Sequence, residues 1–176
     1  LFKQNILTAP VSIEKLDILD IEQSSAANFY DELYKIKGVD MIVQSLSMRF
    51  PNTRGFNGNT NYRINQLVDG VNNSAPGLSF APGNIFGLVQ LDVESVELVV
   101  GASSALYGPG GMNGTLLMTS KNPFDYQGLS MSIQGGIMHL NNDYESDPSI
   151  MNDVSFRYGK KISDKVAFKI IGGYLN

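Results

Sequence analysis

The sequence lacks cysteine and tryptophan, and it contains one histidine among 176 residues. Without cysteine the chain can form neither a disulfide scaffold nor a thiolate metal site. The lone histidine, His139, has no paired carboxylate motif beside it and does not make a metal site either. No apolar run reaches the length that a transmembrane helix needs.

Charge is also scarce. Asp, Glu, Lys and Arg make up 17% of the chain, and the formal net charge is −4 at pH 7. A nucleic-acid-binding domain presents a basic surface, so this balance argues against nucleic acid as a partner. Because no nucleophile–base pair, His-Glu-x-x-His motif or recognisably spaced carboxylate pair is present, we expect neither enzyme activity nor a cofactor.

Glycine is abundant, with 18 residues, and it is concentrated in the most informative stretch, residues 93–121. Residues 96–100 are apolar and mostly β-branched apart from the charged Glu97, which predicts a strand, and residues 116–119 are predicted to form a second apolar strand. Residues 103–106 suffice for one helical turn. The predicted turn glycines of the connection are Gly101, Gly108, Gly110 and Gly111.

A glycine-rich connection between strands can cradle phosphate, and a purely structural turn is the alternative. The third glycine of a G-x-G-x-x-G motif is replaced by Asn113, and no Gly-Lys-Ser/Thr follows. The pattern therefore favours a structural turn.

The stretch resembles the closing signature of the plug domain of TonB-dependent outer-membrane receptors. The resemblance is carried by Val96-Glu97-Leu98-Val99, Ser104-Ala105-Leu106-Tyr107-Gly108 and Asn113-Gly114. The form of residues 92–97 and 105–109 is similar to receptors of the Bacteroidetes type. Two departures are clear: the family usually has Arg where this chain has Val100, and Pro where it has Ala102.

Two earlier motifs occur in the family's order, Arg54-Gly55-Phe56 and Val68-Asp69-Gly70-Val71. Gly55, Asp69 and Gly70 are predicted turn residues, since Asp-Gly after the apolar strand 64–68 is a strong turn signal. Asp69 alone can also suggest a metal ligand or an acid catalyst, but no second acidic residue or histidine lies near it in sequence.

Two short helices are expected before this signature. Phe29, Leu33 and Ile36 fall on one face of a predicted helix that is capped by Ser24 or Ser25 and ended by Gly38. Residues 85–91 are predicted to form a second short helix.

The resemblance implies roles for side chains of the plug. Arg54 and Glu97 are candidates for a latch that holds the plug to a barrel wall, with a solvated surface Arg54 as the alternative. The loops 56–62 and 72–80 are expected to face outward toward a solute, although the same residues can also pack against the wall. The candidate solute-facing residues are Phe56, Asn57, Asn59, Tyr62, Asn72, Asn73, Leu78, Phe80 and Tyr107.

After residue 123 the pattern changes to alternation. Residues 128–140, 153–159 and 166–174 alternate apolar with polar or small side chains, at about the length of a tilted membrane-crossing strand. The long polar segment 141–151 and the tight turn 162–164 match the long outer loops and short periplasmic turns of a barrel. A soluble antiparallel sheet with one buried face is the alternative.

We therefore expect an α+β plug domain over residues 1–123, with a small mixed sheet, short helices and long loops. Residues 124–176 are expected to form the first three antiparallel strands of an incomplete transmembrane β-barrel. The implied function is occlusion of an outer-membrane barrel together with solute binding and energy-coupled import. A soluble envelope binding or adhesion module is the alternative.

The resemblance also implies partners and a location. The plug would sit in the barrel lumen of the outer membrane, reached from the periplasmic side. Its partners would be TonB, through an N-terminal box outside this sequence, its own C-terminal barrel, outer-membrane lipid and a surface lipoprotein. The imported solute would be an iron chelate, haem, cobalamin, a glycan or a peptide.

Overall fold

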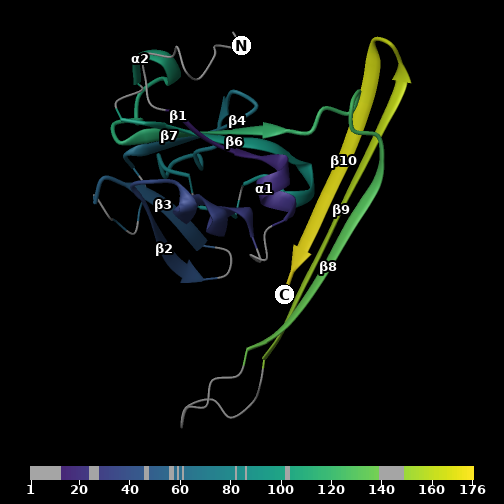
Figure 1. The fold of residues 1–176 in the computed structure, drawn as a ribbon, viewed down its shortest axis with the longest axis horizontal. Coiled ribbons are helices and arrows are strands. Elements are labelled where there is room, and N and C mark those ends of the chain that lie inside the picture. The colour runs from purple at the N-terminus through teal and green to yellow at the C-terminus, as the bar shows by residue number, and fades with distance from the viewer. Residues whose placement is uncertain are drawn as a thin grey trace. The chain divides into compact units, whose positions relative to one another are not determined.

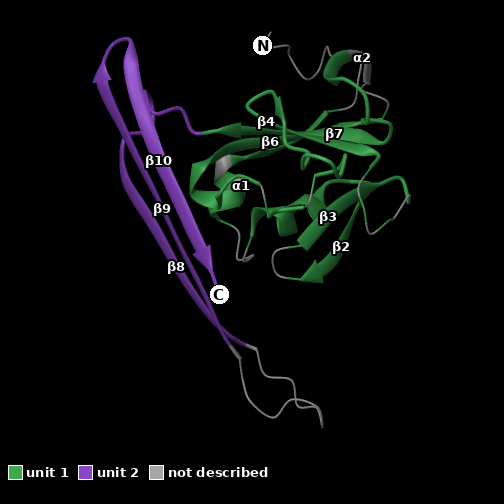
Figure 2. Cartoon of the chain, turned by 180° about the vertical axis from the view of Figure 1, so that it is seen from behind, with its two compact units in different colours: residues 1–120 green, residues 121–176 purple. Residues whose placement is uncertain are grey.

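The computed structural model describes residues 13–23, 28–45, 48–55, 58, 60, 62–81, 83–85, 87–101, 104–138 and 149–176. The chain separates into two compact units, residues 1–120 and residues 121–176 (Figure 2). Each unit has its own sheet, and each is described separately. None of the helices in the described part of the chain is long and apolar enough to cross a membrane.

Unit 1 is built on a five-stranded sheet with the strand order β1-β6-β7-β4-β5 (Figure 1). Strands β4 and β7 pair in parallel, whereas the other neighbours pair antiparallel, so the sheet is mixed. Strand β4 ends at the predicted Asp69-Gly70 turn, and β6 and β7 are the two strands predicted around the glycine-rich connection. The strands are β1 (Ile13–Asp17), β4 (Ile64–Val68), β5 (Val71–Asn72), β6 (Val93–Val100) and β7 (Gly114–Ser120).

Between β1 and β4 the chain forms a layer on one side of this sheet (Figure 1). It comprises the α-helix α1 (Ile18–Glu22), the 3₁₀-helix η2 (Phe29–Lys35) and an antiparallel hairpin of β2 (Val39–Ser45) and β3 (Met48–Thr53). The helix α2 (Ser104–Tyr107) lies on the opposite side of the sheet (Figure 1).

The predicted helix around Leu33 exists, but its cap and type differ from the prediction. It is a 3₁₀-helix capped by Asn28, whose side-chain oxygen accepts a hydrogen bond from the Tyr30 amide at 2.9 Å. Ser24 and Ser25 lie outside the described residues. Its C-terminal cap is Ile36, and Gly38 follows with a left-handed φ of 80°.

The prediction of a helix over residues 85–91 is wrong. Among the described residues of this stretch, which exclude residue 86, only the 3₁₀-helix η3 (Gln90–Asp92) forms, after a loop that contacts strand β3. Asn84 in that loop accepts a hydrogen bond from the Arg49 amide at 3.1 Å. This contact holds the loop against the hairpin edge, and Gly87 N donates to Asn84 O in a tight turn.

The hydrophobic core lies between η2 and the inner face of the sheet. Phe29, Leu33 and Ile36 are all buried, as their spacing predicted. The sheet contributes alternate residues of two central strands, because successive side chains of a strand point to opposite faces. The core residues are Ile21, Phe29, Tyr30, Leu33, Ile36, Val39, Val93, Val96, Leu98, Leu116 and Met118.

Unit 2 is a three-stranded antiparallel sheet with the order β10-β9-β8. Its strands are β8 (Gly128–Met138), β9 (Ser149–Ser163) and β10 (Val166–Leu175). All three predicted alternating segments therefore form strands. Strand β9 extends through Ser163, so the tight turn consists of residues 164–165 and begins later than the sequence indicated.

Candidate functional site

The first candidate surface is a pair of aromatic rings from two loops of unit 1. Tyr62 lies just before β4, and Phe80 lies at the end of the turn 75–80. Their rings meet edge to face with centroids 5.2 Å apart. Tyr62 is 55% exposed, so the pair presents an aromatic surface to solvent or to a bound molecule. Offset and edge-to-face geometries are the arrangements that aromatic rings prefer.

The loop that carries Phe80 is shaped by its own backbone. Ala75 N donates to Phe80 O at 3.0 Å and Leu78 N donates to Ala75 O at 3.1 Å, which closes a tight turn. Leu78 lies at the tip of this turn with 51% of its surface exposed. An apolar side chain held at the tip of a loop is suited to contact with another molecule.

The asparagines of this loop act in part on the chain itself. Asn72 Oδ1 accepts hydrogen bonds from the amide of Ser74 at 2.9 Å and from its hydroxyl at 2.7 Å. Asn73 N donates to Gln66 O at 2.8 Å. Tyr107 ends a different element, α2, and is half-buried. Phe56, Asn57 and Asn59 lie outside the described residues.

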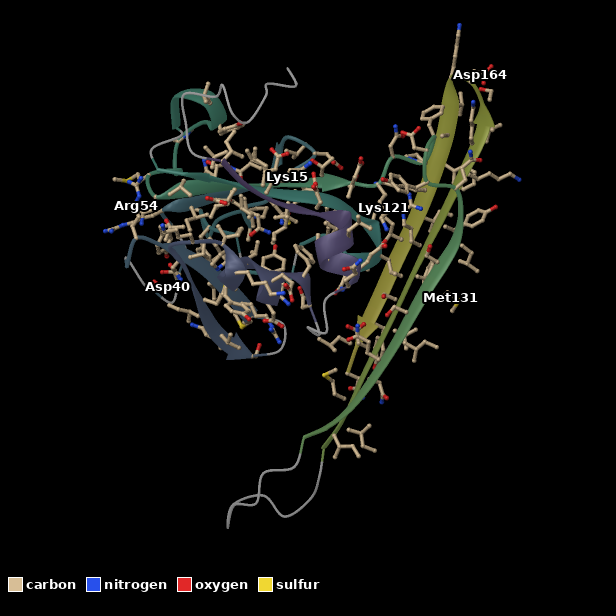
Figure 3. The ribbon with its side chains drawn as sticks, viewed as in Figure 1. Lys15, Asp40, Arg54, Lys121, Met131 and Asp164 are labelled. Atoms are coloured by element: carbon tan, nitrogen blue, oxygen red, sulfur yellow. The ribbon has the colours of Figure 1, made fainter. Side chains whose placement is uncertain are left out.

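Arg54 lies in a turn at the edge of unit 1, where Figure 3 labels it. Arg54 and Gly55 both have left-handed backbone, with φ of 60° and 70°. The guanidinium passes over Gly101, where an ideal Cβ would lie 3.0 Å from Arg54 Nη2. Gly101 thus has two reasons to be glycine, its φ of 102° and this close approach.

Glu97 lies on β6 of the five-stranded sheet, whereas Arg54 follows β3 of the hairpin. Glu97 is half-buried opposite Lys15, four residues before Gly101, which corresponds to roughly 13 Å along a strand. Lys15 pairs with Asp17 at 2.6 Å, and this hydrogen bond raises the pKa of Lys15 against the opposing effect of burial. The charge of Glu97 adds to the rise. The structure therefore does not bring the two predicted latch residues together.

The glycine turn after α2 is held from within by a residue that the sequence did not single out. Asn65 on β4 donates its amide to Gly108 O at 3.3 Å and to Pro109 O at 2.9 Å. Gly110 has φ of 103°, and an ideal Cβ there would lie 2.4 Å from Asn65 Oδ1. Gly111 is buried. A turn packed this closely on a buried amide agrees with the structural interpretation rather than with a phosphate cradle.

Asp69 has a second role beyond its turn. Its backbone is left-handed, with φ of 50°, and its carboxylate accepts hydrogen bonds from the Ser120 amide at 2.9 Å and hydroxyl at 2.6 Å. It thereby secures the end of β7. Among the described residues, no group of three or more His, Cys, Asp or Glu is placed to hold a metal ion.

The sheet of unit 2 has two chemically different faces. The register places large apolar side chains of all three strands on one face, and these side chains are exposed. The opposite face carries small, polar and charged residues such as Ser130, Ser155 and Arg157. The apolar face consists of Leu129, Met131, Ile133, Ile137, Ile150, Val154, Phe156, Phe168, Ile170 and Tyr174.

Comparison with known proteins supports the resemblance that the motifs indicated. Residues 5–115 match the family model described as "TonB-dependent Receptor Plug Domain". Among curated proteins, the chain is 29% identical over 146 residues to "Heme/hemopexin utilization protein C" of Haemophilus influenzae. That match covers 80% of this chain and 19% of the relative, so the chain spans about a fifth of the length of the curated relatives it matches.

Solved structures share the fold. The siderophore receptor PirA of Acinetobacter baumannii superimposes with a TM-score of 0.65 at 19% identity, covering 93% of this chain and 24% of PirA. A mutant of the ferric enterobactin receptor PfeA of Pseudomonas aeruginosa gives a TM-score of 0.66 at 19% identity, covering 97% and 25%. These superpositions extend over both the plug and the start of a receptor barrel.

The similarity to the Bacteroidetes form remains a prediction. The matches favour a receptor plug over a soluble envelope module, and they place the chain in a family of receptors rather than enzymes. Since the family model covers more than half of the chain, the chain belongs to the TonB-dependent receptor plug-domain family.

Proposed function

We propose that the chain is the plug and the first three barrel strands of an outer-membrane transporter whose import step is driven through TonB. The observation that carries this proposal is the succession of a plug-family domain by a sheet with one apolar and one polar face. A soluble module does not ordinarily expose an apolar face of that extent.

The dimensions of the second sheet support membrane insertion. Strands β8, β9 and β10 contain 11, 15 and 10 residues, and a tilted strand crosses a bilayer with about 9–11. Each large apolar side chain on the outward face would gain roughly 1.5–3 kcal/mol on burial in hydrocarbon. Three strands leave two open edges, so on this proposal further strands would close the barrel.

The domain assignment follows from this proposal. Residues 1–123 are the plug that occludes the lumen, and residues 124–176 begin a wall that in plugged transporters of this kind has about 22 strands. Arg54 and Glu97 remain candidates for two separate contacts between plug and wall, since they do not meet each other. TonB would act from the periplasmic side through an N-terminal box outside this sequence.

The cargo we propose is haem or a ferric chelate. The support is the identity to a haem/hemopexin utilization protein and the structural likeness to siderophore receptors. The exposed Tyr62 ring meets the half-buried Phe80 ring edge to face, and with Leu78 in the same loop region it offers an apolar surface for an aromatic or macrocyclic solute. Cobalamin, a glycan and a peptide are the alternative cargoes, which the uptake experiment separates, and a surface lipoprotein is a further proposed partner.

The test is uptake by the full-length receptor in a Gram-negative host stripped of its own haem and siderophore receptors. We expect growth on haem or on a ferric siderophore as sole iron source, and loss of that growth when TonB is deleted. Growth that is equal without TonB would contradict energy-coupled import. Growth on neither iron source, with uptake of a glycan or peptide instead, would contradict the proposed cargo.

A paired substitution tests the aromatic surface. Tyr62→Ala with Phe80→Ala should weaken solute binding by about tenfold or more, since each stacked aromatic contact contributes on the order of 1 kcal/mol. Tyr34→Ala is the matched control, because Tyr34 is a similarly exposed tyrosine on η2. Binding is measured on the purified full-length receptor, and equal affinities for both variants would remove the aromatic pair from the proposed site.

A further inference from the structure

Arg157, on β9, is hydrogen-bonded to the segment at the start of unit 2. Arg157 lies on the polar face of unit 2 and is only 2% exposed. Its Nη1 donates to Tyr126 O at 3.0 Å, and its Nη2 donates to Lys121 O at 3.2 Å. Both acceptors belong to residues 121–127, the segment that precedes β8. The planar fork of a guanidinium is suited to holding two oxygens in fixed positions.

A second cation converges on the same segment. Lys169 on the neighbouring strand β10 donates its Nζ to Lys121 O at 3.1 Å. Lys121 O therefore receives hydrogen bonds from two charged groups on two strands. Hydrogen bonds from charged donors are stronger than those between neutral groups, so this carbonyl is a firm point of attachment.

Gly159 makes room for this contact. It lies two residues after Arg157 on the same face, and an ideal Cβ there would lie 2.7 Å from Tyr126 O and 3.2 Å from Arg157 Nη1. Any side chain would therefore push the segment away from the strand. Arg157, Lys169 and Gly159 are called the linker clamp below.

The gripped segment has a defined shape of its own. The amides of Asp125 and Tyr126 both donate to Asn122 O, at 3.1 and 2.9 Å. The amide of Phe124 donates to Asn122 Oδ1 at 3.1 Å, and Asn122 Nδ2 donates to Asp125 Oδ2 at 2.9 Å. The segment is thus a tight turn whose end carbonyls are directed to the clamp.

We propose that the linker clamp fastens residues 121–127 to the barrel wall and so sets the point at which removal of the plug from its N-terminus must stop. Arg157 is a positioning residue in this role, since it acts on the backbone rather than on the solute. The inference rests on the proposed function in one respect, namely that the plug is displaced during import.

The direct test is hydrogen exchange of residues 121–127 in the full-length receptor. Arg157→Ala removes two charged hydrogen bonds, and we expect the amides of Asp125 and Tyr126 to exchange on the order of tenfold faster. Arg157→Lys keeps the charge but cannot span both carbonyls, so it should give an intermediate increase. Lys160→Ala is the matched control, because Lys160 carries the same charge on the opposite face of β9 and should change nothing.

Gly159→Ala provides an independent perturbation with Arg157 left in place. The added methyl group would collide with Tyr126 O, so the same two amides should again exchange faster. If Arg157→Ala does not assemble, the exchange rates of these two amides in Gly159→Ala test the clamp instead. Exchange that is unchanged in every variant that assembles, or equally raised in Lys160→Ala, would overturn the clamp.

The mechanical consequence is tested by pulling the plug of the full-length receptor from its N-terminus in a lipid bilayer. With both cations of the clamp removed, in Arg157→Ala with Lys169→Ala, release of the seven residues 121–127 should lengthen the low-force extension by up to about 24 Å, at roughly 3.4 Å per residue. An unchanged extension would refute the stopping role. Neither measurement depends on cargo or TonB, so loss of uptake alone would count against the proposed function and not against the clamp.

Discussion

Replacing Tyr30 by Phe tests whether one buried polar contact joins the two layers of unit 1. Tyr30 on η2 is fully buried, and its hydroxyl accepts a hydrogen bond from Gln66 Nε2 on β4. The hydroxyl also contacts Met118 Sδ on β7 at 3.6 Å. Without it, Gln66 Nε2 would keep only a 3.4 Å contact with Gly83 O. A poorly satisfied buried donor costs about 1–3 kcal/mol, which is the expected loss of stability near neutral pH.

The pH dependence sharpens this prediction. Burial raises the pKa of Tyr30 well above its ordinary value of 10.0, and the hydrogen bond from Gln66 only partly opposes the rise. The folded state therefore keeps a proton that the unfolded chain loses. The contribution of Tyr30 to the free energy of unfolding is complete below about pH 10, and it falls by about 1.4 kcal/mol per pH unit above that pH. Phenylalanine does not titrate, so Tyr30→Phe has no such loss. The free energies of unfolding of the parent protein and of Tyr30→Phe should therefore become equal within about two pH units above pH 10.

Because these 176 residues contain no cysteine, a thiol introduced among them can report opening of the plug once any cysteine elsewhere in the full-length receptor is replaced by serine. Val96→Cys places it in the core, where Val96 is fully buried, and iodoacetamide labelling is followed with and without Tyr30→Phe. Tyr30→Phe should label faster by about fivefold to a hundredfold near pH 8, given the expected cost. Equal rates near pH 8, or a difference that does not shrink as the pH rises, would refute the reasoning.

Three further predictions concern turns of unit 1. Arg54→Ala should loosen the plug and raise passive leakage of small solutes through the full-length receptor, and unchanged permeability would remove Arg54 as a latch. Asp69→Ala should lose about 1–2 kcal/mol and expose the Ser120 amide to faster exchange, whereas Asp69→Asn should lose less, because Asn tolerates the left-handed backbone. Gly110→Ala should destabilise the plug more than Gly108→Ala in denaturant titrations, because both have positive φ but only Gly110 is crowded by a neighbouring side chain.

Much of the fold follows from local signals in the sequence. The alternation of residues 128–174 predicts three strands because a strand turns successive side chains to opposite faces. The turn after β4 is predictable because Asp69 and Gly70 both accept the left-handed backbone it needs, with φ of 50° and 83°. These features depend on neighbours within a few residues, so composition and period suffice to find them.

The contacts that position the site depend on distant partners. Asn65 meets Pro109 O across 44 residues, and Arg157 meets Tyr126 O across 31. In each case a polar side chain binds a backbone carbonyl, and a carbonyl is present whatever the partner residue is. Such a pair leaves no pattern of residue types in the sequence. The alternation identified Arg157 only as a member of a polar face.

The two units also differ in how they can yield to force. A domain of the size of unit 1 is held by a net 5–15 kcal/mol, and its core depends partly on polar contacts such as that of Tyr30 with Gln66. Strands in a bilayer cannot separate without leaving backbone groups unsatisfied in hydrocarbon, at several kcal/mol each. On the proposed function, a pull that enters at the N-terminus therefore opens unit 1 before β8, β9 and β10. Arg157 and Lys169 both donate to Lys121 O, so on this proposal the resistance to pulling changes at the linker clamp.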